Sequence, residues 1–201
     1  KIEAWENALP SYLKLAYLPN PGAVRLRLSA YEVEGESVSK EIERQFEALR
    51  KIIPHNIIGY ETATMQELVH KLLTERGLTL ATAESCTGGN IAARFTAMPG
   101  ASAYFLCGVV SYSNASKHDI LGVDPEVIAR HGAVSEEVAR RMAEGARRIS
   151  GADYAIATTG IAGPAGGSAE KPVGTVWIAV AGPRRTVALL KQCGSHRGQI
   201  I

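Results

Sequence analysis

The first sixty residues change from the spacing of strands to that of a helix. Apolar side chains recur at every second position in residues 11–18 and 24–33, a period that favours two half-buried strands. The breakers Pro19-Asn20-Pro21-Gly22 predict a turn between them. A helical period follows over residues 36–53, carried by Val38, Ile42, Phe46 and Leu49.

The end of this first unit is marked by Pro54, which stops the helical period. A short apolar run over residues 56–60 predicts one more strand. We therefore expect a small α+β domain with the order β-β-α-β over residues 1–62.

From residue 63 onward, helices and apolar strands alternate. Thr64 and Glu67 form a capping-box pattern before a helix, and Gly77 is the expected glycine after it. The remaining periodicities predict strands at 78–83, 104–112, 153–159, 173–181 and 185–193, and helices at 89–97, 113–121, 125–131 and 136–150. This alternation indicates an α/β layered sandwich, in which a mixed sheet is flanked by helices, over residues 63–201.

Two of these elements have the clearest patterns. The helix after Ser135 has an N-cap and ends at Gly151, with a predicted buried stripe of Val138, Met142, Ala146 and Ile149. Oppositely charged residues four positions apart support it, namely Glu136/Arg140, Glu137/Arg141 and Glu144/Arg148. The run over 104–112 is apolar throughout, which is typical of a strand buried on both faces.

Composition narrows the function classes. The formal net charge of +2 is too small for a nucleic-acid-binding footprint. The three cysteines lack the paired spacing of a disulfide framework or a zinc site, so we expect a cytoplasmic protein without a metal. An apolar leader and an apolar stretch of membrane-spanning length are both missing from the printed sequence, so no membrane partner is expected.

A first segment with candidate catalytic residues joins a strand to a helix and reads Ala83-Glu84-Ser85-Cys86-Thr87-Gly88-Gly89. A small nucleophile stands there beside the unpaired N–H groups of a helix start, which can hold a phosphate or an oxyanion. The segment differs from the hydrolase nucleophile elbow and from the P-loop. Cys86 is an alternative nucleophile, and an ordinary strand-to-helix turn with Ser85 or Thr87 as a cap is the plain alternative.

A second segment, Ser111-Tyr112-Ser113-Asn114-Ala115-Ser116-Lys117, follows the apolar run. A serine nucleophile needs a base, and a lysine can serve if burial lowers its pKa enough to leave it neutral. Tyr112 could relay a proton or bind an oxyanion. Spacing alone is equally compatible with an unremarkable strand end.

A third segment is rich in glycine. Residues 158–167 read Thr-Thr-Gly-Ile-Ala-Gly-Pro-Ala-Gly-Gly, and Lys171 follows shortly after. Glycine lets a backbone approach a ligand closely, so such a loop suits a nucleotide or a phosphate, with Lys171 as the counter-charge. The spacing differs from the dinucleotide-binding fingerprint, and a long surface loop is the alternative.

Together these segments resemble one family. Six motifs occur in order: A-E-S-C-T-G-G at 83–89, P-G-A-S at 99–102, Y-S-N at 112–114 with Lys117, H-G-A-V-S at 131–135, G-I-A-G-P at 160–164 and K-P-V-G-T-V at 171–176. Residues 63–198 are similar to the C-terminal domain of the CinA (competence/damage-inducible) family. Residues 1–62 resemble the middle domain that precedes it in long family members.

The resemblance implies an amidohydrolase that converts nicotinamide mononucleotide and water to nicotinate mononucleotide and ammonia, without a cofactor or a metal. It implies Ser85 as the nucleophile, Lys117 as the base and Tyr112 as an assisting group. The substrate contacts expected on this basis are Thr87, Gly88, Gly89, Asn114, Thr159, Gly160, Gly163, Lys171 and Arg197. A homodimer is also expected from the family.

The chain departs from the family's long form in two respects. It lacks the upstream domain credited with nucleotide pyrophosphatase activity, so that activity is not expected of these residues. The last helix of the family is expected to be cut short after Ile201. Two other functions stay open, namely a regulatory module that binds nucleotide without turnover and a DNA-associated protein, the latter disfavoured by the near-neutral charge.

Overall fold

The computed structural model describes residues 1–20, 23–31, 33, 35–60 and 64–201, apart from the side chain of Asn20. Contacts divide the chain into two units, residues 1–62 and residues 63–201. The turn expected at Pro21 and Gly22, and the junction of the two units at Thr62 and Ala63, lie outside the described residues.

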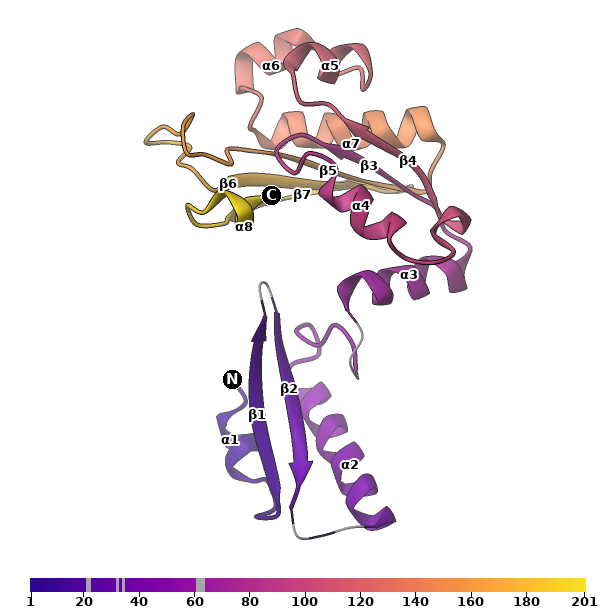
Figure 1. Ribbon diagram of the computed structural model, residues 1–201, viewed down its shortest axis with the longest axis vertical. Coiled ribbons are helices and arrows are strands. Elements are labelled where there is room, and N and C mark those ends of the chain that lie inside the picture. Colours follow the sequence, from indigo (N-terminus) through magenta and orange to yellow (C-terminus); the bar gives the residue numbers. More distant parts are fainter. Residues whose placement is uncertain (21–22, 32, 34, 61–63) are drawn as a thin grey trace. The chain divides into compact units, whose positions relative to one another are not determined.

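The first unit contains a two-stranded antiparallel sheet and two helices (Figure 1). Its elements are α1 (Glu3–Asn7), β1 (Leu13–Asn20), β2 (Ala23–Ala30) and α2 (Glu36–Ile52). Trp5, Leu28 and Leu49 form its buried core, so the predicted alternation on the two strands and the helical period after them both serve one small core.

The prediction of a strand at residues 56–60 was wrong. The N–H group of Asn56 donates to the carbonyl of Ile53 in a turn, and the segment after it has no strand partner. Ile57 packs against the core of the unit while Ile58 is 57% exposed. The short helix α1, which the pattern did not predict, contributes Trp5 to that core instead.

The second unit is built on a five-stranded mixed sheet, as predicted. Its strands are β3 (Leu80–Glu84), β4 (Phe105–Val110), β5 (Tyr154–Gly160), β6 (Thr175–Ala181) and β7 (Thr186–Gln192). Their order is β4-β3-β5-β6-β7, with β4, β3 and β5 parallel and with β6 and β7 antiparallel to their neighbours. Because β3 and β4 are parallel, the segments that follow them meet at one edge of the sheet.

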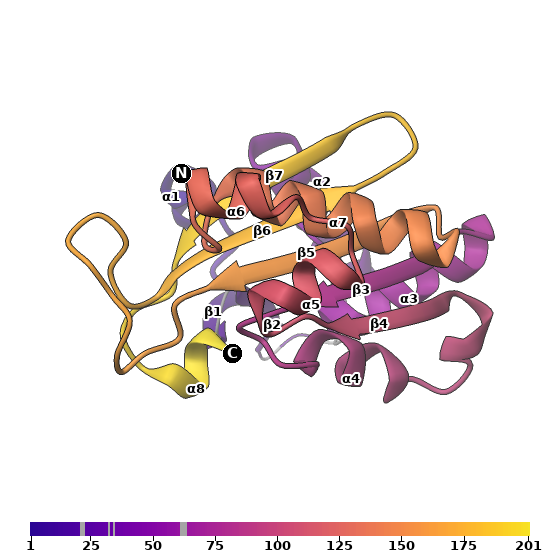
Figure 2. The ribbon, with the colours of Figure 1, turned by 90° about the horizontal axis from the view of Figure 1, so that it is seen from above.

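Helices cover both faces of this sheet (Figures 1 and 2). The long helix α7 lies on one face, on the side that also carries α5 and α6, whereas α3, α4 and α8 lie on the other. The bounds of these helices are α3 Met65–Arg76, α4 Asn90–Thr96, α5 Asn114–Asp119, α6 Pro125–His131, α7 Glu136–Ser150 and α8 Arg197–Ile200, with a short 3-10 turn at Ala101–Ala103. Among the described residues, no helix is long and apolar enough to cross a membrane.

Helix α7 forms the main core with the sheet. Ser135 caps its first turn by accepting from the N–H group of Val138 at 3.3 Å, and its C-cap Gly151 is left-handed. At Gly145, an added Cβ would lie 2.1 Å from the carbonyl oxygen of Leu121, so the glycine permits a close approach there. Ala139, Ala143 and Ala146 are buried on this helix, whereas Ile149, predicted to be buried, is 45% exposed.

Strand β4 corrects a second prediction. It stands at the edge of the sheet, and its side chains alternate between half-buried and exposed instead of being buried on both faces. Leu106 and Val110 are each 48% exposed. An apolar run cannot by itself distinguish an edge strand from a central one, because the distinction depends on how many neighbours the strand acquires.

Candidate active site

The nucleophile candidate Ser85 begins the turn between β3 and α4. Its N–H group donates to the carbonyl of Thr158 on β5 at 3.0 Å, and its own carbonyl accepts from Gly88 at 3.1 Å. Only 8% of the residue is exposed. The serine is therefore held by backbone bonds on both sides while its hydroxyl stays available for a partner.

The partner of that hydroxyl is Lys117. Helix α5 begins at a capping box of Ser113 and Ser116, and this start places Lys117 inside the protein with 1% of its surface exposed. The Nζ atom lies 3.1 Å from Ser85 Oγ, 2.8 Å from the carbonyl oxygen of Ser111 and 3.4 Å from that of Tyr112. The structure thus brings together Ser85 and Lys117, the two residues that the family resemblance named as nucleophile and base.

The surroundings of Lys117 favour its neutral amine. Burial lowers its pKa below the ordinary value, and the nearby Cys86 opposes this only as a thiolate. No carboxylate of the described residues pairs with this lysine. A neutral amine has two N–H bonds and one lone pair, which match two carbonyl acceptors and one hydroxyl that can donate. Lys117 is thus placed to accept the proton of Ser85.

A cavity of about 300 Å³ opens at this pair. Its lining comes from the nucleophile turn (residues 85–89, which carry Ser85), the start of α5, the loop before α7, the glycine-rich loop between β5 and β6, and α8. The lining residues are Ser85, Cys86, Tyr112, Asn114, Lys117, Ala133, Val134, Thr159, Gly160, Ile161, Ala162, Gly163, Ala165, Gly166 and Arg197.

The glycine-rich loop is fixed at both ends of the cavity. The hydroxyl of Thr159 donates to the carbonyl of Ala133 at 2.7 Å, so it joins β5 to the loop before α7. The guanidinium of Arg197 donates to the carbonyl of Gly163 at 2.7 Å. A Cβ at Gly163 would lie 2.6 Å from a methyl group of Val173, and its φ is +71°, so the loop needs glycine there.

Tyr112 and Asn114 lie on the open side of the cavity. Tyr112 is 62% exposed, and its backbone carbonyl is one of the acceptors around Lys117. Asn114 is the first residue of α5 and is exposed as well. Their phenol and amide groups are therefore placed where a bound molecule would meet them.

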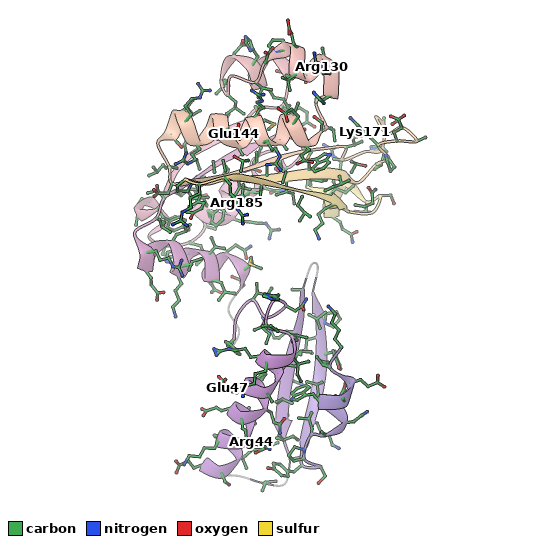
Figure 3. All side chains as sticks on the ribbon, turned by 180° about the vertical axis from the view of Figure 1, so that it is seen from behind. Arg44, Glu47, Arg130, Glu144, Lys171 and Arg185 are labelled. Carbon is green, nitrogen blue, oxygen red and sulfur yellow. The ribbon has the colours of Figure 1, made fainter. Side chains whose placement is uncertain are left out.

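The structure does not bring Thr87, Gly88, Gly89 or Lys171 into the lining of this cavity. The N–H groups of Gly88 and Gly89 donate within the protein, to Ser85 and to Glu84. The expectation that these groups face a ligand is therefore corrected, because the protein already supplies their acceptors. Lys171 donates to the carbonyl of His131 at 2.9 Å, beside the glycine-rich loop (Figure 3).

Sequence reasoning missed two contributors. Glu84 is fully buried and its carboxylate accepts the N–H groups of Gly89, Ile91 and Ala92. Ala133 contributes the carbonyl that holds Thr159. The H-G-A-V-S motif was a signal for the second, whereas nothing in local capping rules points to a glutamate six positions before a helix.

Cys86, the alternative nucleophile, lines the cavity beside Ser85 but is buried. Burial raises the pKa of its thiol, which disfavours the thiolate that would react. A larger hollow of about 830 Å³ lies beside the β6–β7 turn. Its lining includes Arg184 and Arg185 but no nucleophile held against a base, so the smaller cavity is the candidate site.

The order of motifs and the fold agree with the result of sequence comparison. The profile of the CinA C-terminal domain matches residues 62–201. The chain belongs to the CinA family.

Relatives in this family cover both units of the chain. A CinA-like protein of Flavobacterium psychrophilum is 45% identical over 202 residues, which is 100% of this chain and 48% of the relative. A CinA-like protein of Chlorobaculum tepidum is 49% identical over 88% of this chain and 42% of the relative. The chain thus spans about half the length of the curated relatives it matches.

Solved structures of CinA proteins share the fold. The competence/damage inducible protein CihA from Agrobacterium tumefaciens has a TM-score of 0.66 and 42% identity, covering 71% of this chain and 89% of that one. A CinA superfamily protein from Escherichia coli has a TM-score of 0.67 and 33% identity, covering 74% of this chain and 89% of that one.

Proposed function

We propose that this chain hydrolyses the carboxamide of nicotinamide mononucleotide to nicotinate mononucleotide and ammonia. The observation that supports it most strongly is the 3.1 Å separation between Lys117 Nζ and Ser85 Oγ, with the lysine buried and its pKa lowered. A module that only bound nucleotide would have no use for a buried amine directed at a serine. A serine held against a base in a cavity is one arrangement that catalyses acyl transfer.

In the first half of the reaction, Ser85 Oγ attacks the carboxamide carbon while neutral Lys117 takes the hydroxyl proton. The carbonyl oxygen becomes an oxyanion, and the phenol of Tyr112 and the amide of Asn114, two residues that line the cavity, would donate hydrogen bonds to it. The C–N bond then breaks as Lys117 returns the proton to the leaving nitrogen. Ammonia departs, and the nicotinoyl group remains as an ester on Ser85.

In the second half, a water molecule attacks the ester carbon and Lys117 takes a proton from it. The ester bond to Ser85 breaks, and the proton returns to the serine oxygen. The serine hydroxyl and the neutral lysine are thus restored, and the product leaves as a carboxylic acid that gives its remaining proton to water and becomes the carboxylate. Because the pyridinium ring withdraws electrons from the carboxamide, a serine activated by one amine suffices as the nucleophile.

The cavity has properties that suit a small anionic nucleotide. Its volume of about 300 Å³ is at the lower end of ordinary ligand pockets. Arg197 supplies a permanent positive charge at the glycine-rich loop, where a phosphate could accept from its guanidinium and from nearby backbone N–H groups. The loop glycines let the backbone approach such a ligand closely.

The decisive experiment measures ammonia release from nicotinamide mononucleotide by the purified chain. Ser85→Ala and Lys117→Met are compared with Ser102→Ala and Lys191→Met, which change an exposed serine and an exposed lysine outside the cavity. We expect release by the parent and both controls, and a loss of about 10³-fold or more in the two site variants.

Full activity in Ser85→Ala would refute the mechanism. A folded parent that binds the nucleotide saturably but releases no ammonia would instead favour the regulatory binding module. A homodimer in the cytoplasm is a further part of the proposal, and light scattering of the purified chain tests the dimer.

A further inference from the structure

Glu84 is an unusual residue to find at the end of a buried strand. It closes β3, directly before Ser85, and its relative exposure is 0%. Burying a carboxylate is costly unless several donors satisfy it. Helices are usually capped by a Ser, Thr, Asp or Asn at the N-cap position itself, so a buried glutamate before the helix calls for a physical reason.

Four donors converge on the Glu84 carboxylate. Oε2 accepts from the hydroxyl of Thr87 at 2.7 Å and from the N–H groups of Gly89 and Ile91 at 3.0 Å each. Oε1 accepts from the N–H group of Ala92 at 2.8 Å. The N-cap residue Gly89 makes no side-chain cap of its own. The first turn of α4 is thus held by a carboxylate from the neighbouring strand.

The same residue is linked to the base. The carbonyl of Glu84 accepts from the N–H group of Ser111 at 2.8 Å, and the carbonyl of Ser111 accepts from Lys117 Nζ at 2.8 Å. Two hydrogen bonds and one residue therefore connect Glu84 to the amine. Its side chain holds the turn that follows Ser85, while its backbone holds the strand end that leads to Lys117.

A third link runs to β5. Thr87 donates its only hydroxyl proton to Glu84, so the 2.7 Å contact between Thr87 and Thr158 is a donation from Thr158. The N–H group of Ser85 donates to the carbonyl of the same Thr158. The turn that carries Ser85 is thus fixed between two parallel strands by side-chain and backbone bonds together.

We propose that Glu84 is the positioning residue of this site, which sets the distance between Ser85 and Lys117 by holding the nucleophile turn, residues 85–89. The inference rests on the proposed function for its kinetic readout. Glu84 is absent from the cavity lining, so it acts through Ser85 and not on the substrate. Catalysis between held groups is sensitive to misplacement by as little as 1 Å.

Glu84→Gln tests this role. The amide can keep one oxygen toward the three donors on the Oε2 side, but its NH₂ group then faces the N–H group of Ala92, a donor against a donor. Relief of that repulsion moves α4 and the turn before it. We expect kcat to fall about 10- to 100-fold while KM changes by less than about twofold, because the cavity lining is untouched.

Asp153→Asn is the matched control. The Asp153 carboxylate also accepts hydrogen bonds between β3 and β5, from the N–H and hydroxyl groups of Thr79 at 2.8 Å each, at the opposite end of these strands. We expect it to lower the midpoint of denaturant unfolding while kcat and KM stay within about twofold of the parent. A loss of kcat equal to that of Glu84→Gln would show a general stability effect and overturn the proposal.

A second readout is independent of the substrate. The rate at which phenylmethylsulfonyl fluoride labels Ser85, followed by intact-protein mass spectrometry, reports the activation of the serine itself. We expect Glu84→Gln to slow labelling in proportion to kcat. If the parent is labelled at Ser85 but releases no ammonia, the proposed substrate is wrong and the labelling rates alone decide the role of Glu84.

Labelling of Glu84→Gln at the parent's rate, or a raised KM with unchanged kcat, would overturn the proposal. So would a parent that is neither labelled nor active, because there would be no activated serine to position. If Glu84→Gln fails to fold, Thr87→Val removes only the hydroxyl between Glu84 and Thr158. That variant is expected to lose about three- to tenfold in kcat and in labelling rate. If Thr87→Val keeps the kcat and labelling rate of the parent, Glu84 is not the positioning residue.

Discussion

Lys117 Nζ lies 3.1 Å from Ser85 Oγ, although 32 positions separate the two residues in the chain. The parallel pairing of β3 with β4 makes this possible, because Ser85 follows β3 and the segment that leads to Lys117 follows β4. The remaining acceptors of the amine are backbone carbonyls, which cannot give it a proton. Of the three oxygens around this amine, only the Ser85 hydroxyl carries a proton that could pass to the lone pair of a neutral lysine.

The pH dependence of activity should follow the protonation of Lys117. Because burial lowers its pKa from 10.5, the inactive protonated amine is lost at a lower pH than in a free lysine. We expect kcat/KM to rise with pH through an apparent pKa below 10.5 and then level off. Steady-state rates measured from about pH 5 to about pH 10 check this rise.

Lys117→Arg is the control for that profile. A guanidinium stays protonated over the whole range, so it cannot accept the serine proton, and we expect no measurable turnover. An active arginine variant, or a parent profile without a basic limb, would remove Lys117 from the role of base.

Stability should show the same titration. Between the lowered pKa of folded Lys117 and 10.5, the unfolded chain binds more protons than the folded one, so the free energy of unfolding rises with pH. Lys117→Met lacks this group. We expect the free energy of unfolding of the parent, measured in urea, to increase relative to that of the variant as pH rises through this window. A difference that stays constant with pH would contradict the lowered pKa.

Cys86 should be dispensable for chemistry. Its thiol stands next to Ser85, but burial raises its pKa and keeps it protonated. We expect Cys86→Ala to retain kcat within about twofold, with a modest loss of stability from the vacated space. Ammonia release and a denaturation curve on the same preparation separate the two effects, and inactivity in a stable variant would point to a cysteine nucleophile.

Arg197 and Lys171 should differ in their effect on KM. Arg197 lines the cavity, whereas Lys171 donates to the carbonyl of His131 outside the lining. We expect Arg197→Gln to raise KM about 10-fold, the effect of losing about 1.4 kcal/mol of charge-assisted hydrogen bonding. Lys171→Gln should change KM by less than about twofold. Equal effects of the two variants in initial-rate assays would restore Lys171 as a substrate contact.

Periodicity was sufficient to predict most elements, because each buries one regular face. It predicted α2, α7 and the strands of the sheet from apolar spacing and caps alone. It failed at residues 56–60, and it predicted burial on both faces for the edge strand β4, because both outcomes depend on which neighbours a segment meets. A single sequence pattern carries no information about such neighbours.

The residues of the candidate site also differed in how well the sequence predicted them. Ser85, Lys117 and the glycine-rich loop stood out as chemical groups in specialised segments, and the family motifs assigned their roles. Glu84 did not stand out, because a carboxylate five to eight positions before its backbone donors matches none of the usual helix-capping patterns. The role of Lys171 stays a prediction, since a cation near a glycine-rich loop can equally donate to a backbone carbonyl, as Lys171 does to that of His131.

The hydrogen bond from Arg197 to Gly163 has a consequence for synthesis in the cell. Translation adds about 5–20 residues per second, so Ser85 and Lys117 leave the ribosome several seconds before Arg197 does. During that interval the glycine-rich loop lacks its hydrogen bond from the Arg197 guanidinium. A nascent chain would therefore carry Ser85 and Lys117 before Arg197 can hold the loop, so the proposed nucleotide site would be complete only after Arg197 has been synthesised.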